Sequence, residues 1–197
     1  KERSEEKVAE LIAQWPDHNL KIETGTNEDA AHCDLIVVAT PWDSTATIVG
    51  EYADALRGKV VITMANALVK VGKEFQPLVP PRGSIAAHVQ AEIPESRVVA
   101  AMQHLPAKEL GNLRHHVDSD VLICSDFPEA IEIVSDLVAQ IPGCRPLSTG
   151  RLSNALALEA FTAVLLQLNV RYKTRVAPRL TGIPDVDPKS GRNMKLD

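Results

Sequence analysis

Short unbroken runs of β-branched and aliphatic residues recur along this chain, with helical patterns between them. The runs lie at residues 34–40, 59–64, 97–102 and 121–124, and a short edge strand is expected at 145–147. Because the runs do not alternate with polar residues, they are typical of strands covered on both faces. The helical patterns lie at residues 26–31, 44–56, 84–92 and 128–140. This order predicts an α/β fold built on a doubly wound parallel sheet.

The first and last helical patterns differ in how their apolar residues are arranged. Near the start, one apolar stripe at helical spacing ends at Pro16, and it consists of Val8, Leu11, Ile12 and Trp15. The last helix, 152–172, is apolar nearly all the way round, so we expect it to pack into a small helical domain or a subunit interface. Glu159 and Gln167 interrupt its apolar run, which is shorter than the roughly 20 residues of a bilayer crossing. No membrane span is therefore predicted.

The charges and the cysteines narrow the class of protein. With 21 Lys and Arg against 26 Asp and Glu, the net charge of −5 argues against a nucleic-acid binder, which would favour a basic face. Cys33, Cys124 and Cys144 lack the spacing of a zinc site and lie in or beside apolar runs, so we expect buried thiols in a reducing cytoplasm. The charged opening residues 1–7 have no apolar core of a signal peptide.

In an open α/β sheet, ligands bind at the carboxyl ends of the strands, so the residues there are the first candidates. Thr40, Pro41 and Trp42 follow the first run, where they form either a wall for a planar ligand or an ordinary strand-to-helix turn. Asn66 follows the second run, to donate to a ligand carbonyl or to close a turn. His104 follows the third, and it is either a group that titrates near neutral pH or a hydrogen-bonded structural residue.

No motif in the chain supplies a nucleophile with its base. There is no GxSxG, HExxH or P-loop pattern, and the pair His115-His116 has no carboxylate or cysteine at metal-ligand spacing. Hydride transfer between two bound cofactors needs no such groups, because the cofactors bring the reactive carbons and the protein aligns them. The sequence is thus consistent with a nucleotide-dependent redox protein.

Several segments, in order and spacing, resemble one family of enzymes. They are CDLIVVATPW at 33–42, NALVKVG at 66–72, QPLVPPRGS at 76–84, VVAAMQHLPA at 98–107, LSN at 152–154 and LLQLNVRYK at 165–173. Together they are similar to the NADPH-dependent reductases of the 5-deazaflavin coenzyme F420, the F420:NADP oxidoreductases, and most to their bacterial branch. The resemblance covers about residues 1–183.

The resemblance implies a fold, an activity and two cofactors. The expected fold is a Rossmann-like NADP-binding domain at 1–148 and a small helical region at 149–183 for deazaflavin binding and oligomerisation. Residues 184–197 are expected to be a flexible tail. The implied activity is hydride transfer between NADPH and coenzyme F420 in the cleft between the two parts. A homo-oligomer is implied as well, which fits the all-round apolar helix.

Residue roles carry over by position from the family. Arg3 is similar to the basic residue that pairs with the 2′-phosphate of NADP, next to a Ser-Arg pair upstream, although a solvated arginine at a helix start is the alternative. Thr40, Pro41 and Trp42 resemble the wall on the nucleotide side. Asn66 resembles a position that contacts the nicotinamide half.

On the deazaflavin side, the resemblance points to the loop after the third run and to the end of the last helix. His104 is counted with the cofactor-binding residues, and Ala107 resembles the small residue where the cofactors approach to within roughly 3–3.5 Å. A basic run there either binds the acidic tail of the deazaflavin or favours the helix C-terminus through its dipole. It consists of Arg171, Lys173, Arg175 and Arg179, and Pro178 lies near the family's deazaflavin contact.

One expected piece is absent from the 197 residues. None of the ten glycines forms GxGxxG, and the chain opens with a helix rather than with a strand and a glycine-rich turn. The family's loop and Ser-Arg pair would precede Lys1, so we expect impaired NADP binding by the chain as it stands. Two other functions stay open: another NADP-dependent imine or hydroxyacid reductase, although helix 152–170 has no lysine donor, and a noncatalytic nucleotide-binding module.

Overall fold

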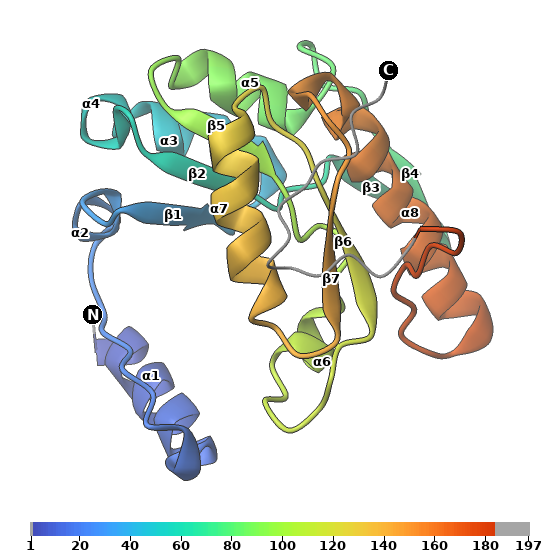
Figure 1. Ribbon diagram of the computed structural model, residues 1–197, viewed down its shortest axis with the longest axis horizontal. Helices are drawn as coiled ribbons and strands as arrows, with labels where there is room; N and C mark the ends of the chain where they lie inside the picture. The colour runs from blue at the N-terminus through green and yellow to red at the C-terminus, as the bar shows by residue number, and fades with distance from the viewer. Residues whose placement is uncertain (1, 184–197) are drawn as a thin grey trace.

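A three-stranded parallel sheet forms the centre of the computed structural model, which describes residues 2–183, without the side chains of residues 2 and 3. Its strands are β1 (Leu35–Val38), β2 (Val60–Thr63) and β5 (Arg97–Ala100), in the order β1-β2-β5. In this register Thr63 lies between Val38 and Ala100, so the three strands end level with one another (Figure 1). The carboxyl ends of the strands therefore form one edge.

A second parallel pair extends this sheet. It consists of β6 (Ser119–Ile123) and β7 (Cys144–Ser148), and α7 (Pro128–Ala139) connects them. The pair meets β5 at a single antiparallel bridge between Ala100 and Cys124. The predicted α/β class with parallel strands is thus confirmed, and the expected edge strand at 145–147 is part of β7.

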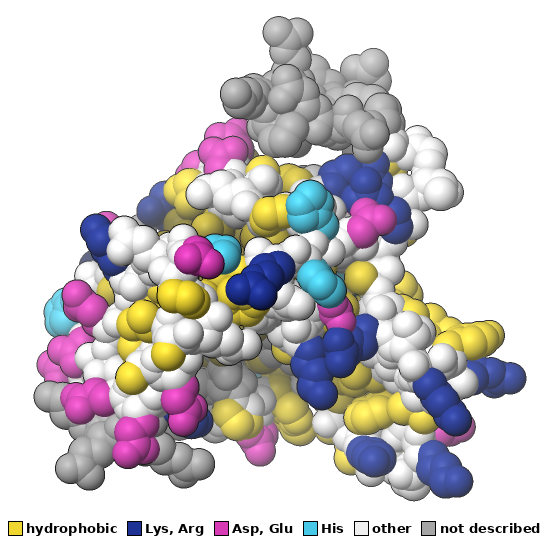
Figure 2. All heavy atoms as spheres, turned by 90° about the horizontal axis from the view of Figure 1, so that it is seen from below, with side chains coloured by type: hydrophobic (Ala, Val, Ile, Leu, Met, Phe, Trp, Pro, Cys, Tyr) yellow, Lys and Arg dark blue, Asp and Glu magenta, His cyan; other side chains and the backbone are white. Residues whose placement is uncertain are grey.

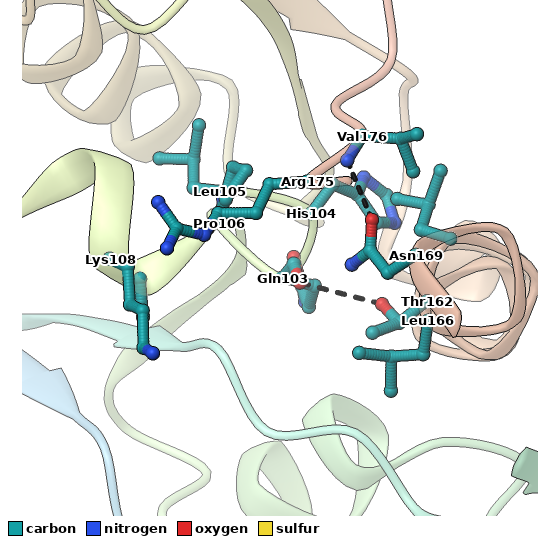
Figure 3. A pocket seen from close by; sticks show the side chains of 12 residues that line it. Gln103, His104, Leu105, Pro106, Lys108, Thr162, Leu166, Asn169, Arg175 and Val176 are labelled. Carbon is teal, nitrogen blue, oxygen red and sulfur yellow. Dashed lines mark hydrogen bonds between the residues drawn. The ribbon is translucent and has the colours of Figure 1, made fainter. Parts of the chain in front are cut away.

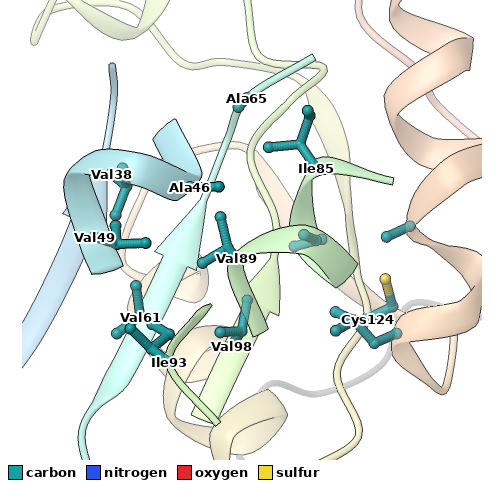
Figure 4. Packing of buried hydrophobic residues seen from close by; sticks show 14 of the residues in the cluster. Val38, Ala46, Val49, Val61, Ala65, Ile85, Val89, Ile93, Val98 and Cys124 are labelled. Atoms are coloured by element: carbon teal, nitrogen blue, oxygen red, sulfur yellow. The ribbon is translucent and has the colours of Figure 1, made fainter. Parts of the chain in front are cut away.

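Helices cover both faces of the sheet because alternate strand residues point to opposite sides. Val61 and Val98 face α3 (Trp42–Gly50) and α5 (Ile85–Glu92), in the cluster drawn in Figure 4. Ile62 and Val99 face α7 on the other side. All four side chains are fully buried, as expected for strands without polar alternation.

Side-chain caps mark where α2 (Asn27–Ala31) and α5 begin. In α2, the side chains of Thr26 and Asp29 cap each other's backbone N–H in a capping box. Ser84 caps α5 by accepting from the Ala87 N–H. The helical pattern at 44–56 forms two helices, α3 and α4 (Ala53–Leu56), with a break at residues 51–52.

The predicted opening helix forms, but its apolar stripe is not covered. α1 (Glu2–Gln14) stands apart from the layers in Figure 1, and none of its residues from 4 to 14 is buried. Only Trp15, just beyond it, is buried, with the Arg114 guanidinium 5.5 Å from its ring centroid. The helix is followed by the short 3-10 turn η1 (Pro16–His18).

An antiparallel hairpin occupies a region for which no element was expected. It consists of β3 (Leu68–Val71) and β4 (Glu74–Pro77). Gly72 sits in the turn with φ of 60°, a conformation that glycine adopts without strain. The alternation Val69, Lys70, Val71 beside this glycine is the signal that could have predicted the hairpin.

The C-terminal helices complete the structure. The 3-10 turn η2 (Leu152–Asn154) leads into α8 (Ala155–Tyr172), which packs against α5 and β4. Within residues 2–183, the stretch Leu152–Tyr172 is the one segment long and apolar enough to cross a membrane, but a buried core helix passes the same test. Leu152, Ala155 and Leu158 belong to the main core cluster, so α8 is partly a core helix.

The cysteines depart in part from expectation. Cys124 is buried and Cys144 half-buried, and burial raises the pKa of Cys124 to about 12. The expectation of a buried thiol was wrong for Cys33, which is exposed. Cys33 lies in the turn between α2 and β1, and its backbone N–H caps the end of that short helix.

Candidate functional site

A cavity of about 340 Å³ lies between α8 and the loop that follows β5, at the carboxyl edge of the sheet. Figure 3 shows its side chains converging from these two elements and from the segment after α8. The short helix α6 (Ala107–Leu110) begins at its rim. The lining residues are Gln103, His104, Leu105, Pro106, Ala107, Lys108, Thr162, Leu165, Leu166, Asn169, Arg175 and Val176.

The side-chain oxygen of Gln103 is a buried hydrogen-bond acceptor at the cavity wall. Gln103 is 7% exposed, and its Nε2 donates to the Thr63 carbonyl at 3.3 Å, which fixes the orientation of the amide. No described residue donates to Oε1. The preceding residue, Met102, has φ of 68°, a strained backbone conformation of the kind that clusters at functional sites. A ligand N–H is the group that such an acceptor lacks.

His104 joins the same loop to α8. Its side chain is 5% exposed, and its Nε2 lies 2.7 Å from the Leu158 carbonyl oxygen, to which the N–H donates. The ring edge packs on Phe161, with centroids 5.3 Å apart. Burial lowers the pKa of His104, so the imidazole is neutral and the hydrogen bond is structural. The ring still contributes one wall of the cavity.

Thr162 links α8 to a second strand end. Its hydroxyl donates to Asn66 Oδ1 at 3.0 Å and lies 3.5 Å from the Gln103 carbonyl oxygen. Asn66 in turn donates from Nδ2 to the Met64 carbonyl. The amide of Asn66 is therefore held at both ends, and its second N–H donates to no other described residue.

The third wall comes from the chain that turns back after α8. Lys173 adopts a left-handed conformation, and the Asn169 side chain accepts from the Val176 N–H at 2.6 Å. This turn brings Arg175 to the cavity, where it forms an ion pair with Glu109 of α6. Ala107, the first residue of α6, is exposed beside them.

The predicted wall at the end of β1 lies outside this cavity. Thr40 and Thr45 hydroxyls are 2.9 Å apart, and the Pro41 carbonyl accepts from the Ser44 and Thr45 N–H groups of α3. Trp42, the first residue of α3, is half-buried against the main core cluster. β1 and β2 are parallel neighbours, so these residues share the carboxyl edge with Asn66.

Two of the four residues of the predicted basic run have acidic partners. Arg175 pairs with Glu109, and Arg179 pairs with Asp118 at 3.3 Å and with buried Asp120 at 3.4 Å. Arg171, in the last turn of α8, is exposed. Figure 2 shows Lys and Arg side chains gathered on the side where α8 lies, and acidic ones on the side of α1.

Pro178 is held by a backbone hydrogen bond to β6 and does not line the cavity. It is buried, and its carbonyl accepts from the Asp120 N–H at 2.7 Å. Asp120 itself is fully buried and accepts two hydrogen bonds from Arg145, at 2.8 and 2.9 Å. The structure therefore does not bring Pro178 together with His104 and Ala107.

Two predicted features lie beyond what the structure describes. Arg3 belongs to α1, but its side chain is outside the described part, and so is the segment 184–197. Among the described side chains, no group of His, Cys, Asp and Glu could hold a metal ion.

Sequence reasoning missed the polar side chains that α8 turns toward the sheet. Glu159, Thr162 and Asn169 stand at spacings of three and seven residues, which places them on one helix face. In a helix that is otherwise apolar, polar residues at this spacing are a signal for the side that meets a polar partner. Gln103, beside the predicted His104, had no comparable signal.

Comparison with known proteins gives consistent matches. The family described as NADP oxidoreductase, coenzyme F420-dependent, matches residues 1–67. The F420-dependent NADP reductase of Methanocaldococcus jannaschii is 35% identical over 152 residues, covering 76% of this chain and 68% of that protein. That of Methanothermobacter thermautotrophicus is 30% identical over 188 residues, covering 91% and 78%.

Solved structures share the fold. A crystal structure of an assigned F420-dependent NADP reductase from Arthrobacter sp. FB24 superposes with a TM-score of 0.67 at 22% identity, covering 77% of this chain and 70% of that one. The hypothetical protein SMa0349 of Sinorhizobium meliloti gives 0.60 at 21% identity, covering 78% and 71%. Because sequence identity of 30–35% with curated relatives extends over at least two thirds of their length, the chain belongs to the family of F420-dependent NADP reductases.

Proposed function

We propose that this chain transfers hydride between NADP and coenzyme F420, with the deazaflavin ring bound in the cavity beside α8. The observation that carries the proposal is its similarity, at 35% identity, to a curated protein named F420-dependent NADP reductase. The cavity volume of about 340 Å³ is within the range of small-molecule sites. Its lining is mostly apolar with a few polar groups, which suits a planar ring that carries N–H and C=O groups.

The residues of the cavity have distinct proposed tasks. When bound, the two cofactors supply the chemistry, because a hydride passes between their ring carbons and one proton is exchanged with solvent. Gln103 Oε1 is placed to accept an N–H of the bound ring. Apolar side chains such as Leu166 and the neutral His104 ring exclude water from it. Ala107 leaves room at the rim for the second cofactor.

The NADP side is proposed along the carboxyl edge of β1 and β2. Thr40, Pro41 and Trp42 line it at the start of α3, and the free N–H of Asn66 points to a contact with the nicotinamide half. Arg3 is proposed for the 2′-phosphate. For the acidic tail of the deazaflavin, exposed Arg171 and Lys173 are the proposed cations, since Arg175 and Arg179 are engaged with acidic residues.

We further propose a homo-oligomer in the cytoplasm, assembled through residues 149–183. Large apolar side chains remain exposed on the outer side of α8 and on the neighbouring hairpin, which supports an interface there. They include Val69, Val71, Val164, Val170 and Tyr172. The three free cysteines support a reducing compartment.

Two measurements test the function. Titration with oxidised deazaflavin, followed by its absorbance or fluorescence, measures binding without NADPH, and addition of NADPH should then bleach the visible absorbance. Ala107→Leu, which fills the rim, should slow turnover by at least tenfold. Ala91→Leu, on an exposed position of α5 outside both the cavity and residues 149–183, is the matched control and should change turnover less than twofold.

Other outcomes separate the alternatives. Reduction of a small imine or keto acid without bleaching of the deazaflavin would favour another NADP-dependent reductase. Binding of nucleotide with no turnover of any of these substrates would favour a noncatalytic module.

A further inference from the structure

Glu159 is a buried carboxylate that joins α8 to the start of another helix. Its side chain is 2% exposed, and its two oxygens accept from the first N–H groups of α5, Ile85 at 2.9 Å and Ala86 at 3.0 Å. The third N–H, of Ala87, is capped by Ser84 of the same segment. The N-terminus of α5 is therefore capped from two elements, and only Glu159 reaches it from α8.

Burying the Glu159 side chain costs free energy because the carboxyl group loses its hydration. The described residues give it no cationic partner in hydrogen-bond contact, so desolvation is opposed only by the two N–H groups and by the positive end of the helix dipole. An apolar side chain would pack in the core without that cost. A buried ionisable side chain under these conditions points to a task in geometry.

The contacts that shape the cavity lie within one helical turn of Glu159. The adjacent Leu158 carbonyl accepts from His104 at 2.7 Å, and Thr162, three residues on, donates to Asn66 at 3.0 Å. One turn of helix rises about 5.4 Å, so a small slide or rotation of α8 at Glu159 moves both contacts together. Hydrogen bonds of this length are lost with a shift of about 1 Å.

We propose that Glu159 is a positioning residue for the deazaflavin cavity: by clamping α8 to the N-terminus of α5, it sets the helix height at which Leu158 and Thr162 hold the loop of Gln103 and His104. The proposal rests on the proposed function, because the cavity is taken to bind the deazaflavin. It concerns binding geometry and assigns Glu159 no contact with the cofactor.

The decisive variant is Glu159→Gln, compared with Ser84→Ala. The glutamine keeps the size of the side chain but turns an NH2 group toward one N–H of α5, so the clamp loosens. Ser84→Ala removes a cap from the same helix N-terminus and leaves α8 untouched. Both variants should lower the urea midpoint, but only Glu159→Gln should weaken binding of oxidised deazaflavin, by about tenfold in Kd.

The KM for deazaflavin should rise with Kd in Glu159→Gln, and kcat should change much less. If Glu159 only stabilised the fold, each of the two variants would instead weaken deazaflavin binding in proportion to its own loss of stability. Equal Kd values for the wild type and Glu159→Gln, or equal weakening by Ser84→Ala, would overturn the proposal.

A measurement on the wild type keeps the proposal testable if Glu159→Gln does not fold. Coupling between two sites is reciprocal, so deazaflavin binding should slow hydrogen exchange of the Ile85 and Ala86 amides by about tenfold. Unchanged exchange at saturating deazaflavin would overturn the clamp. A wild type that binds no deazaflavin would overturn the proposed function and the clamp with it, whereas binding without these effects overturns the clamp alone.

Discussion

The two end helices, α1 and α8, contrast in how their sequence patterns relate to burial. α1 has the spacing of an amphipathic helix, yet Leu11 is 40% and Ile12 37% exposed. α8 is apolar nearly all round, yet its polar Glu159 and Thr162 are buried at 2% and 8%, while Val164 is 50% exposed. In neither helix does hydropathy alone predict which side chains are buried.

The difference lies in specific partners. α8 is fixed by hydrogen bonds from the first N–H groups of α5 to Glu159, from His104 to the Leu158 carbonyl and from Thr162 to Asn66. The partners lie 54 to 96 residues apart in the sequence. α1 is followed by a single buried anchor, Trp15. We therefore expect substitutions on α8 to affect stability and the cavity, and substitutions on α1 to affect neither.

The largest expected effect is that of Leu158→Ala. Leu158 is 5% exposed within the main core cluster, so truncation should lower the free energy of unfolding by about 2–5 kcal/mol. Urea denaturation measures it. Val164→Ala on the same helix, measured on the monomer, is the control and should cost less than about 0.5 kcal/mol. Comparable losses of stability in the two variants would mean that α8 does not pack on the core through the face that carries Leu158.

A smaller effect is expected from pH. Burial raises the pKa of Glu159 from its ordinary 4.5 to about 7, although the Ile85 and Ala86 N–H groups act in the opposite direction. The folded state therefore holds its proton more tightly than the unfolded state, and stability should fall as pH rises from about 4.5 through about 7. Comparison of Glu159→Gln with the wild type isolates this contribution, on the order of 2 kcal/mol.

The measurement is the urea midpoint of both proteins at pH 5 and pH 8. The wild type should lose more stability over this interval than Glu159→Gln. The lowered pKa of His104 acts with the opposite sign, favouring stability at higher pH, but it is common to both proteins and cancels in the difference. The same pH dependence in both would show that Glu159 does not titrate as its burial requires.

The smallest effect is expected from Leu11→Ala on α1. The side chain is 40% exposed, and alanine is at least as good a helix former, so the free energy of unfolding should change by less than about 0.5 kcal/mol. Urea denaturation over a range of protein concentrations is the check. A loss above about 1 kcal/mol would show that another surface covers this stripe in solution.

Much of the fold could be predicted because its signals are local. Runs such as 34–40 and 97–102 have no polar alternation, and they form β1 and β5, the two strands that flank β2 in the three-stranded sheet. Pro128 marks the start of α7, and the capping pair of Thr26 and Asp29 marks α2. The hairpin at 68–77 was missed because its strands are short and lie among turn residues.

The candidate site was predicted only in part. The rule that ligands bind at the carboxyl ends of strands led to His104, and the family resemblance led to Ala107; both residues line the cavity. It could not place Pro178, whose backbone pairs with β6, or show that Arg175 and Arg179 are bound to Glu109, Asp118 and Asp120. Such partners are brought together only by the folded chain.

The sequence by itself determined the α/β class, the runs that form the parallel strands, the starts of α2, α5 and α7 and, through its resemblance, the family. These follow from periodicity, capping and motif order, which act over a few residues. Only the tertiary structure decided which side of α8 is buried, that Glu159 caps α5, and that Thr162 and Asn66, 96 residues apart, share a hydrogen bond at the cavity. The physical reason is that a buried polar group is stable only where a distant part of the chain supplies its partner.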